Sequence, residues 1–303
     1  MFSIIIPTLN NLDYLKVCIK SIKKNSNFTH EIIPHVNIGS DGTKEFLLSE
    51  KIDFTYTEYN SGICKGMNLA AKRAKFNYIL YAHDDFYFCP DWDTILKKEI
   101  ENIGHNDFYL SGTMINNGQI DFDCGNSINT FDEKKFLENH KKYNYYDFQG
   151  STWAPHLIHK DNWNKVGGFS EEFFPGTGSD PDLNMKLWNL GIRIFKGINN
   201  FKVYHFGSIV TRRYKNHPSI KTESGSRGAK IFLLKWGISI NFFKKYILKS
   251  DSEYKKPLEE PKKNISYFFN LLLCKLNYLY IKYFYNFKNR NNLINNEISK
   301  NKN

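Results

Sequence analysis

The stretch FSIIIPT, residues 2–8, is an apolar run that ends in a proline and a threonine. A run of this kind, without polar alternation, is typical of a strand that is buried on both faces of a parallel sheet. Along residues 12–22, apolar side chains then recur at helical spacing, with lysines on the opposite side. The pattern predicts a buried strand followed by a helix that packs on it.

The same alternation continues to residue 103. Further strands are predicted at 31–38, 52–59 and 78–82. Helices are predicted at 43–50 and at 90–103, which opens at Pro90, and residues 60–75 read as a glycine-containing loop that leads into a helix. Strands that alternate with helices form a mostly parallel sheet that is covered by helices. We therefore predict an α/β fold with a Rossmann-like sheet.

Polar residues stand where each predicted strand ends: Pro7–Thr8, Ser40–Asp41, Asn60 and Asp84–Asp85. In open α/β sheets, ligands bind in the crevice beyond the carboxyl ends of the strands. Four polar clusters that are separate in the sequence are therefore expected to meet at one rim, which predicts a binding site there.

The acidic pair Asp84–Asp85 is the most informative of these clusters. Two adjacent aspartates can cap the next helix, but this pair lies several residues before the proline that opens it. Carboxylates together with substrate phosphates are a usual ligand set for Mg²⁺ or Mn²⁺. His83 favours Mn²⁺, because imidazole suits softer metals. The pattern indicates a site for a divalent cation.

The charge of the chain is concentrated near its carboxyl end. The formal net charge is +11 and the pI is about 9.2, and residues 255–303 hold ten Lys or Arg against three Glu, which accounts for +7. A nucleic-acid-binding protein would instead carry a basic face on its folded domain. Five cysteines without C-x-x-C spacing favour a reducing compartment and argue against a thiolate zinc site. Nucleic acid is therefore not expected as a partner.

The chain is expected to be cytoplasmic, because its start lacks the pattern of a signal peptide. The longest apolar stretch, 265–287, is interrupted by Lys275 and Lys282, which argues against a membrane span. Aromatic residues with lysines at intervals fit a helix on an anionic membrane surface, peripheral to its inner face. They fit equally well a helix that packs on the rest of the chain or on a second subunit.

Six short motifs follow one another along residues 2–210. They are SIIIPTLNN (3–11), SDGT (40–43), NSGICKGMN (60–68), HDDFYFCPDW (83–92), VGGFSEEFFPGTGSDPDLNMKLWNLG (166–191) and YHFGS (204–208). In kind and in order, these motifs resemble those of the family 2 glycosyltransferases, whose members have the GT-A fold and are expected to invert the anomeric carbon.

The resemblance implies a nucleotide-diphosphate sugar as donor, with a UDP-sugar expected. Pro7, Thr8, Asn10 and Asp41 would border the base and ribose, and Asp84 the ribose or the donor sugar. Asn60, Gly62 and Asn68 would shape the floor of the site, and Lys65 is a candidate for the diphosphate.

The resemblance also implies the residues that carry the chemistry. Asp85 and His205 would hold Mn²⁺ or Mg²⁺, with His83 as a further candidate ligand, although the family more often has Asp or Asn at that position. Asp180 falls where the family keeps its general base. Asp182 is the alternative, because Ser179 replaces a common Glu, but Asp182 is better placed to cap the following helix.

The acceptor would be a hydroxyl of a glycan or of a glycolipid. Trp153 and His156 could form a platform for its sugar ring, although a buried core Trp explains the same residue. We expect a catalytic domain at 1–210, with a nucleotide-binding half at 1–104 and an acceptor half at 105–210. A basic helical extension at 211–254 and a linker with a basic aromatic tail at 255–303 would follow.

Two alternatives to this function stay open in the sequence. A nucleotidyltransferase could use a similar sheet and metal, but it would usually have a glycine-rich basic loop after the first strand, where this chain has PTLNNLDY. A catalytically inactive protein of the same fold that binds sugar or nucleotide would also explain the departures at His83 and Ser179.

Overall fold

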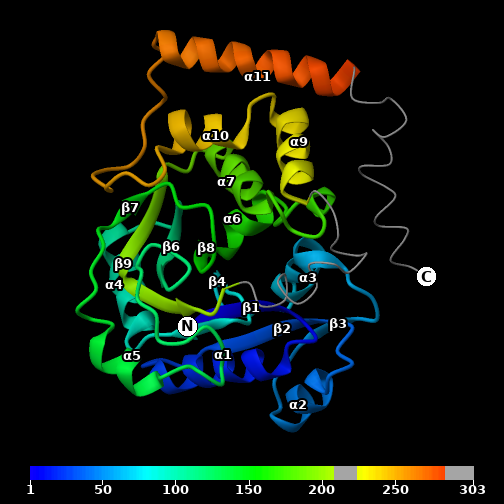
Figure 1. Ribbon diagram of the computed structural model, residues 1–303, viewed down its shortest axis with the longest axis vertical. Coiled ribbons are helices and arrows are strands. Elements are labelled where there is room, and N and C mark those ends of the chain that lie inside the picture. Colours follow the sequence, from blue (N-terminus) through cyan, green and yellow to red (C-terminus); the bar gives the residue numbers. More distant parts are fainter. Residues whose placement is uncertain (208–223, 284–303) are drawn as a thin grey trace.

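The computed structural model describes residues 1–207 and 224–283, with side chains for all of these except 224–226 (Figure 1). The start of the predicted basic extension, 211–223, and the predicted tail beyond 283 lie outside the described residues. The strands are β1 (Phe2–Leu9), β2 (Glu31–Asn37), β3 (Thr55–Thr57), β4 (Tyr78–Tyr81), β5 (Phe86–Phe88), β6 (Phe108–Ile115), β7 (Phe148–Gln149), β8 (His156–His159) and β9 (Ile194–His205).

Helices connect and cover these strands. They are α1 (Leu12–Asn25), α2 (Thr43–Ser49), α3 (Gly62–Ala71), α4 (Trp92–Ile103), α5 (Glu133–Asn139), α6 (Lys160–Lys165), α7 (Ser179–Asn189), α9 (Ser224–Trp236), α10 (Ile240–Phe242) and α11 (Ile265–Tyr283), with a 3-10 turn η1 (Glu171–Phe173) and a π-helical turn η2 (Phe243–Leu248).

The strands form one sheet in the order β3-β2-β1-β4-β8-β6-β9-β5, and β7 pairs with β9 beside this path. Strands β1 to β4 are parallel, and β6 is parallel to β9. Strand β8 is antiparallel to both of its neighbours, and β5 and β7 are antiparallel to β9. The predicted α/β fold with a mostly parallel sheet is confirmed.

The first predicted strand lies near the middle of the sheet, as its composition requires. Residues 2–8 of β1 are all buried, because β2 and β4 flank the strand and α3 packs against it. Helix α1 buries the apolar side chains that recur at helical spacing, among them Leu15 and Ile19. These side chains join the main hydrophobic core of the molecule.

One predicted helix begins later than expected. Helix α4 starts at Trp92 and not at Pro90, because Asp91 has a left-handed backbone (φ 66°) that turns the chain just before the helix. This turn places the Trp92 ring in the core, against Phe2 and Phe88, with ring centroids 5.9 and 5.0 Å away.

The carboxyl-terminal helices continue the same core. Phe232 of α9 and Phe243 of η2 are fully buried and belong to the cluster that also contains β1 and β4 side chains. Helix α11 lies outside α9 and α10, at the end of the molecule opposite α1 and α2 (Figure 1). No helix of the described residues is both long enough and apolar enough to cross a membrane.

Candidate active site

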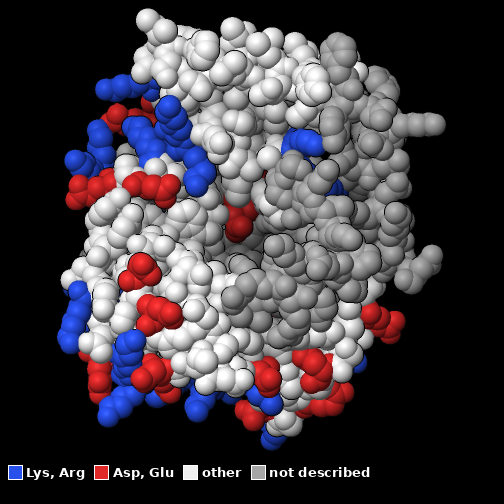
Figure 2. All heavy atoms as spheres, viewed as in Figure 1, with Lys and Arg blue, Asp and Glu red and all other residues white. Residues whose placement is uncertain are grey.

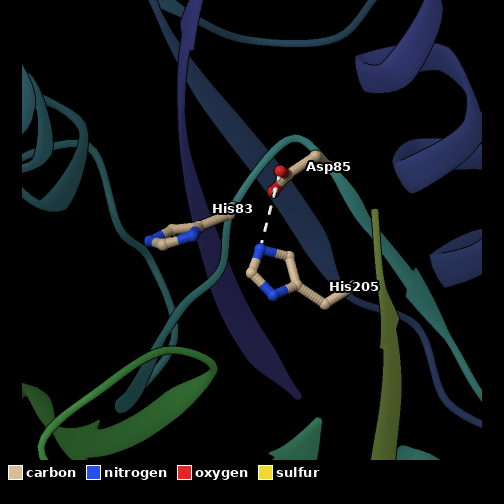
Figure 3. A group of neighbouring side chains, drawn as sticks. All are labelled: His83, Asp85 and His205. Atoms are coloured by element: carbon tan, nitrogen blue, oxygen red, sulfur yellow. Dashed lines mark ion pairs between the residues drawn. The ribbon is translucent and has the colours of Figure 1, made fainter. Parts of the chain in front are cut away.

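The loop between β4 and β5 carries His83 and Asp85, and strand pairing brings His205 to it. In the antiparallel pair of β5 with β9, Phe86 lies opposite His205, and the Phe206 N–H donates to the Asp85 carbonyl at 3.1 Å. As a result, His205 Nε2 lies 3.6 Å from Asp85 Oδ2 (Figure 3). Two predicted ligands that are 120 positions apart in the sequence are thus neighbours.

The ring of His83 completes this group from the other side. It stacks on Phe86 with ring centroids 5.0 Å apart, and its Nε2 lies 2.9 Å from the Tyr81 hydroxyl, so that Nδ1 is the nitrogen left to face a cation. One ligand atom each from His83, Asp85 and His205 lies within 4.8 Å of the other two (Figure 3). Two imidazoles and one carboxylate are a donor set that suits a transition-metal ion.

Neighbouring groups hold both histidines in a form that can bind a metal. His205 Nδ1 lies 3.2 Å from the Asn117 carbonyl, to which it can donate, and in that tautomer Nε2, which lies 3.6 Å from Asp85 Oδ2, is the nitrogen available to a metal. Burial lowers the pKa of His83 to about 4, so its ring is neutral at neutral pH, as a ligand must be. The residues therefore fit a divalent cation.

Asp180 stands in the first turn of α7 and is half-buried. Its Oδ1 is buried without a hydrogen-bond partner among the described residues, and burial raises the pKa of this carboxyl to about 7. Its charge also adds to the burial that raises the pKa of Tyr81, the last residue of β4. Asp180 thus lies near the end of β4, from which the loop that carries Asp85 leaves. A carboxyl with a pKa near neutrality suits a general base.

Asp182 has a different environment, which argues against both roles predicted for it, the helix cap and the alternative base. Helix α7 begins at Ser179, so Asp182 lies inside its first turn and does not cap it. The carboxylate has no exposed surface: it accepts from the Trp236 Nε1–H at 2.8 Å and lies 2.9 Å from the Lys235 ammonium. Ser170 donates a further hydrogen bond to it. Asp182 therefore joins α7 to α9, and this enclosure disfavours it as a base.

Asn10 and Asp41, which are predicted to border the nucleotide, link the loops after β1 and β2. Asn10 Oδ1 accepts from the Ser40 N–H at 2.9 Å, and Asp41 Oδ2 accepts from the Leu12 N–H at 2.8 Å. The loops after β1 and β2 therefore hold each other in place, next to the buried Thr8. Pro7 is part of β1, and it is paired in register with His35 of β2.

The start of α3 brings its polar residues to the same side of the sheet. Asn60 Oδ1 accepts from the Gly62 N–H at 3.0 Å, and Gly62 has a left-handed backbone (φ 76°). A Cβ at this position would lie 2.7 Å from the Phe174 ring, so only glycine allows the close approach. Lys65 Nζ lies 2.8 Å from the Tyr59 hydroxyl.

Asn68 acts as a clamp between α3 and the segment that leads to α7. Its Nδ2 donates to the Phe169 carbonyl at 2.8 Å, and its Oδ1 accepts from the Phe169 N–H at 2.9 Å.

Asp84 is buried beside Asp85. Figure 2 shows acidic atoms at the base of a hollow on this face of the molecule.

The predicted acceptor residues differ in their exposure. Trp153 is half-buried, stacks on Phe148 with centroids 6.1 Å apart, and has the Lys244 ammonium 5.5 Å from its ring. His156 is fully buried in β8, with Nδ1 3.0 Å from the Tyr109 hydroxyl, and burial lowers its pKa to about 3. His156 therefore has no surface that an acceptor could touch, which corrects its predicted role.

Sequence reasoning missed the residues that support the predicted ones. Asn117, Lys235 and Trp236 all contact predicted site residues, from 53 to 88 positions away. The dipeptide Asn116–Asn117 before a glycine does signal a turn, and both residues have positive φ. Nothing in the sequence shows that this turn contacts His205.

The arrangement of strands and helices is that of the GT-A fold. A structure of S. aureus TarS, residues 1–349, matches with a TM-score of 0.56 and 14% identity, covering 95% of this chain and 76% of that one. The same TarS region has also been solved in complex with UDP-GlcNAc, with a TM-score of 0.54 and 13% identity, covering 99% and 81%.

The profile of the family described as Glycosyl transferase family 2 matches residues 3–164, and the chain belongs to this family. The putative teichuronic acid biosynthesis glycosyltransferase TuaG of Bacillus subtilis (strain 168) is 30% identical over 106 residues, covering 33% of this chain. The chondroitin synthase of Pasteurella multocida (strain Pm70) is 26% identical over 245 residues, covering 67% of this chain. The matches span 41% and 24% of these two relatives. These matches favour a member of a glycosyltransferase family over a nucleotidyltransferase.

Proposed function

We propose that the protein transfers a sugar from a UDP-sugar to a hydroxyl of a glycan or a lipid-linked acceptor, with inversion at the anomeric carbon. The observation that carries this proposal is that His83, Asp85 and His205 meet at the carboxyl end of β4, with Asp180 near the same strand end. The choice of donor is supported by the related fold of TarS, which has been solved with UDP and with UDP-GlcNAc.

The donor would lie on the rim built by the loops after β1, β2 and β4. The interlocked pair Asn10 and Asp41 would border the base and ribose, beside Pro7 and Thr8. Asn60, Gly62 and Lys65 would lie under the diphosphate, because they gather at the start of α3. We assign donor binding to residues 1–104 and acceptor binding to 105–210.

We propose that Asp85, His205 and His83 hold Mn²⁺ in preference to Mg²⁺. Mg²⁺ favours an octahedral shell of oxygen ligands, whereas this site offers two ring nitrogens. A bound divalent cation would neutralise the negative charge that develops on the leaving diphosphate. Asp84 would contact the ribose or the donor sugar from the same loop.

Asp180 is proposed as the general base that accepts the proton of the attacking hydroxyl. Burial raises the pKa of its carboxyl to about 7 while part of the side chain stays exposed, whereas Asp182 is enclosed by its partners. Inversion follows if Asp180 and the leaving diphosphate lie on opposite faces of the donor sugar. Trp153 is proposed to contact the acceptor ring, because it keeps an exposed part.

The acceptor proposed here is a growing saccharide, so the product would be part of a surface polysaccharide or a glycolipid. The names of two relatives, a teichuronic acid biosynthesis glycosyltransferase and a chondroitin synthase, support a saccharide as the acceptor. We place the reaction in the cytoplasm, at the inner face of an anionic membrane if the acceptor is lipid-linked.

The test is a calorimetric titration of the full chain with UDP, GDP, dTDP and CDP, each with and without Mn²⁺. We expect UDP to bind only with the metal, and Asp85→Ala to abolish this binding. Asp161→Ala, which removes an exposed carboxylate from the first turn of α6, is the matched control and should bind as the wild type does. Equal UDP affinity with and without metal would overturn the assigned role of Asp85. Retained binding without sugar transfer or donor hydrolysis would identify an inactive protein.

A further inference from the structure

Helix α11 has two apolar faces on opposite sides. It has 19 residues and contains no Asp or Glu. At 3.6 residues per turn, its apolar side chains fall into two groups that polar residues separate: Ser266, Asn270 and Asn277 on one side, and Asn264, Lys275 and Lys282 on the other. A helix with a single apolar face needs one partner, whereas this helix offers surfaces for two.

The inner face of α11 holds the helix on the protein. Cys274 is buried at the centre of this face, and its thiol lies 3.4 Å from the Ser239 N–H. Tyr267 packs edge-on against Phe242 with ring centroids 5.0 Å apart, and Leu271 and Tyr278 join the same core. The inner face therefore fixes the orientation of the helix on α9 and α10.

The outer face is exposed along the whole length of the helix. Ile265 is 90% exposed, Phe269 60% and Leu276 54%. On a helical projection the exposed apolar residues cover an uninterrupted arc of about 140°. The arc consists of Ile265, Phe268, Phe269, Leu272, Leu273, Leu276, Leu279, Tyr280 and Tyr283. Soluble proteins rarely expose a contiguous apolar patch of this kind without a partner for it.

All charged side chains of residues 261–283 are positive. Lys275 and Lys282 lie along one edge of the arc, and Lys262 and Lys263 are exposed just before the helix begins. No acidic residue occurs from 261 to 283. A basic edge beside an apolar face complements an anionic lipid surface, and tyrosines in such a face suit the boundary between headgroups and acyl chains.

We propose that the outer face of α11 is a membrane-docking surface, which inserts its apolar side chains among the acyl chains of an anionic bilayer. Pairing with a second copy fits less well, because two such faces would bring basic edges together without any acidic partner in α11. The exposed arc is also wider than the narrow seam that a pair of helices uses. The helix lies at one end of the molecule, so docking through it would leave the hollow of Figure 2 facing sideways and accessible (Figures 1 and 2). This surface does not depend on the proposed activity.

The test is flotation of the full chain with vesicles of phosphatidylcholine alone, or of phosphatidylcholine mixed with an equal amount of phosphatidylglycerol. We expect binding to the anionic vesicles only, and Leu276→Asp should weaken it about tenfold or more, because it places a charge in the middle of the apolar arc. Asn277→Asp is the matched control, since it adds the same charge one residue away on the polar edge. The control should weaken binding by about fivefold at most.

Metal-dependent UDP binding is measured on the same proteins. It should be unchanged in Leu276→Asp, so that loss of docking is separated from loss of the proposed function. No flotation of the wild type with anionic vesicles would overturn the proposal, as would equal flotation of Leu276→Asp and the wild type. Light scattering that shows a wild-type dimer and a Leu276→Asp monomer would overturn it in favour of a second copy of the chain.

Discussion

Replacing Asp180 by asparagine tests the role of the carboxyl and its environment together. In the folded protein, burial raises the pKa of Asp180 to about 7, from an ordinary value of 3.8. Between these two pH values the unfolded chain releases the proton while the folded chain keeps it. The stability of the wild type therefore falls as pH rises through this window, relative to a variant without the carboxyl, and levels off above about pH 7.

The size of this effect follows from the shift. A pKa of about 7 in the folded chain, against 3.8 in the unfolded chain, changes the free energy of unfolding by at most about 4 kcal/mol, at about 1.4 kcal/mol for each tenfold change in affinity for the proton. Because water reaches part of the side chain, we expect Asp180→Asn to be more stable than the wild type by about 1–2 kcal/mol at pH 8. The difference in stability between Asp180→Asn and the wild type should nearly vanish at pH 4. In a chain of this length it corresponds to a rise in melting temperature of about 2–6 °C.

The same substitution should remove the base. We expect the release of UDP from the donor sugar to fall by about 10²–10⁴-fold in Asp180→Asn, and the wild-type rate to rise with pH up to about 7. Melting temperatures at pH 4 and pH 8, with donor turnover at pH 8, measure both effects on one preparation.

Asp182→Asn is the control, and its expected effect on the stability of the protein is opposite in sign to that of Asp180→Asn. It removes a buried carboxylate that is paired with Lys235 and Trp236, so it should destabilise the protein by about 2–3 kcal/mol at pH 8. The reasoning on Asp180 is refuted if Asp180→Asn turns over donor at the wild-type rate, or if its stability gap over the wild type shrinks as pH rises from 4 to 8.

Two further substitutions test the metal group and the clamp on α3. His83→Asp replaces a ring nitrogen by a carboxylate, so the ratio of activity with Mg²⁺ to activity with Mn²⁺ should rise about tenfold; a ratio that stays constant in paired assays would show that His83 is not a ligand. Asn68→Ala leaves the Phe169 N–H and carbonyl without their partner, which should lower the free energy of unfolding by about 1–3 kcal/mol in a thermal or urea titration. Lys72→Ala, at an exposed position one turn further along, should leave it unchanged, and equal stability of the two variants would contradict the clamp.

The sequence by itself determined the elements of the first half and the chemistry gathered at their ends. Strand β1 needs only a run of buried residues to be recognised, and the period of α1 is equally local. Polar residues at the ends of parallel strands must lie on the same edge, so the loop with Asp84 and Asp85 could be placed at the rim in advance. Its contact with the predicted ligand His205 is present in the structure.

Only the tertiary structure decided which groups are enclosed and which remain reachable. Asp180 and Asp182 stand two positions apart and look alike in the sequence, but α9 brings Lys235 and Trp236 to Asp182 alone. His156 likewise became a core residue because β6 and β4 both flank β8. The two faces of α11 carry similar side chains, and only packing against α9 and α10 shows which of them is covered. Burial depends on partners that are far away in the chain, whereas the patterns within a sequence report only on neighbours.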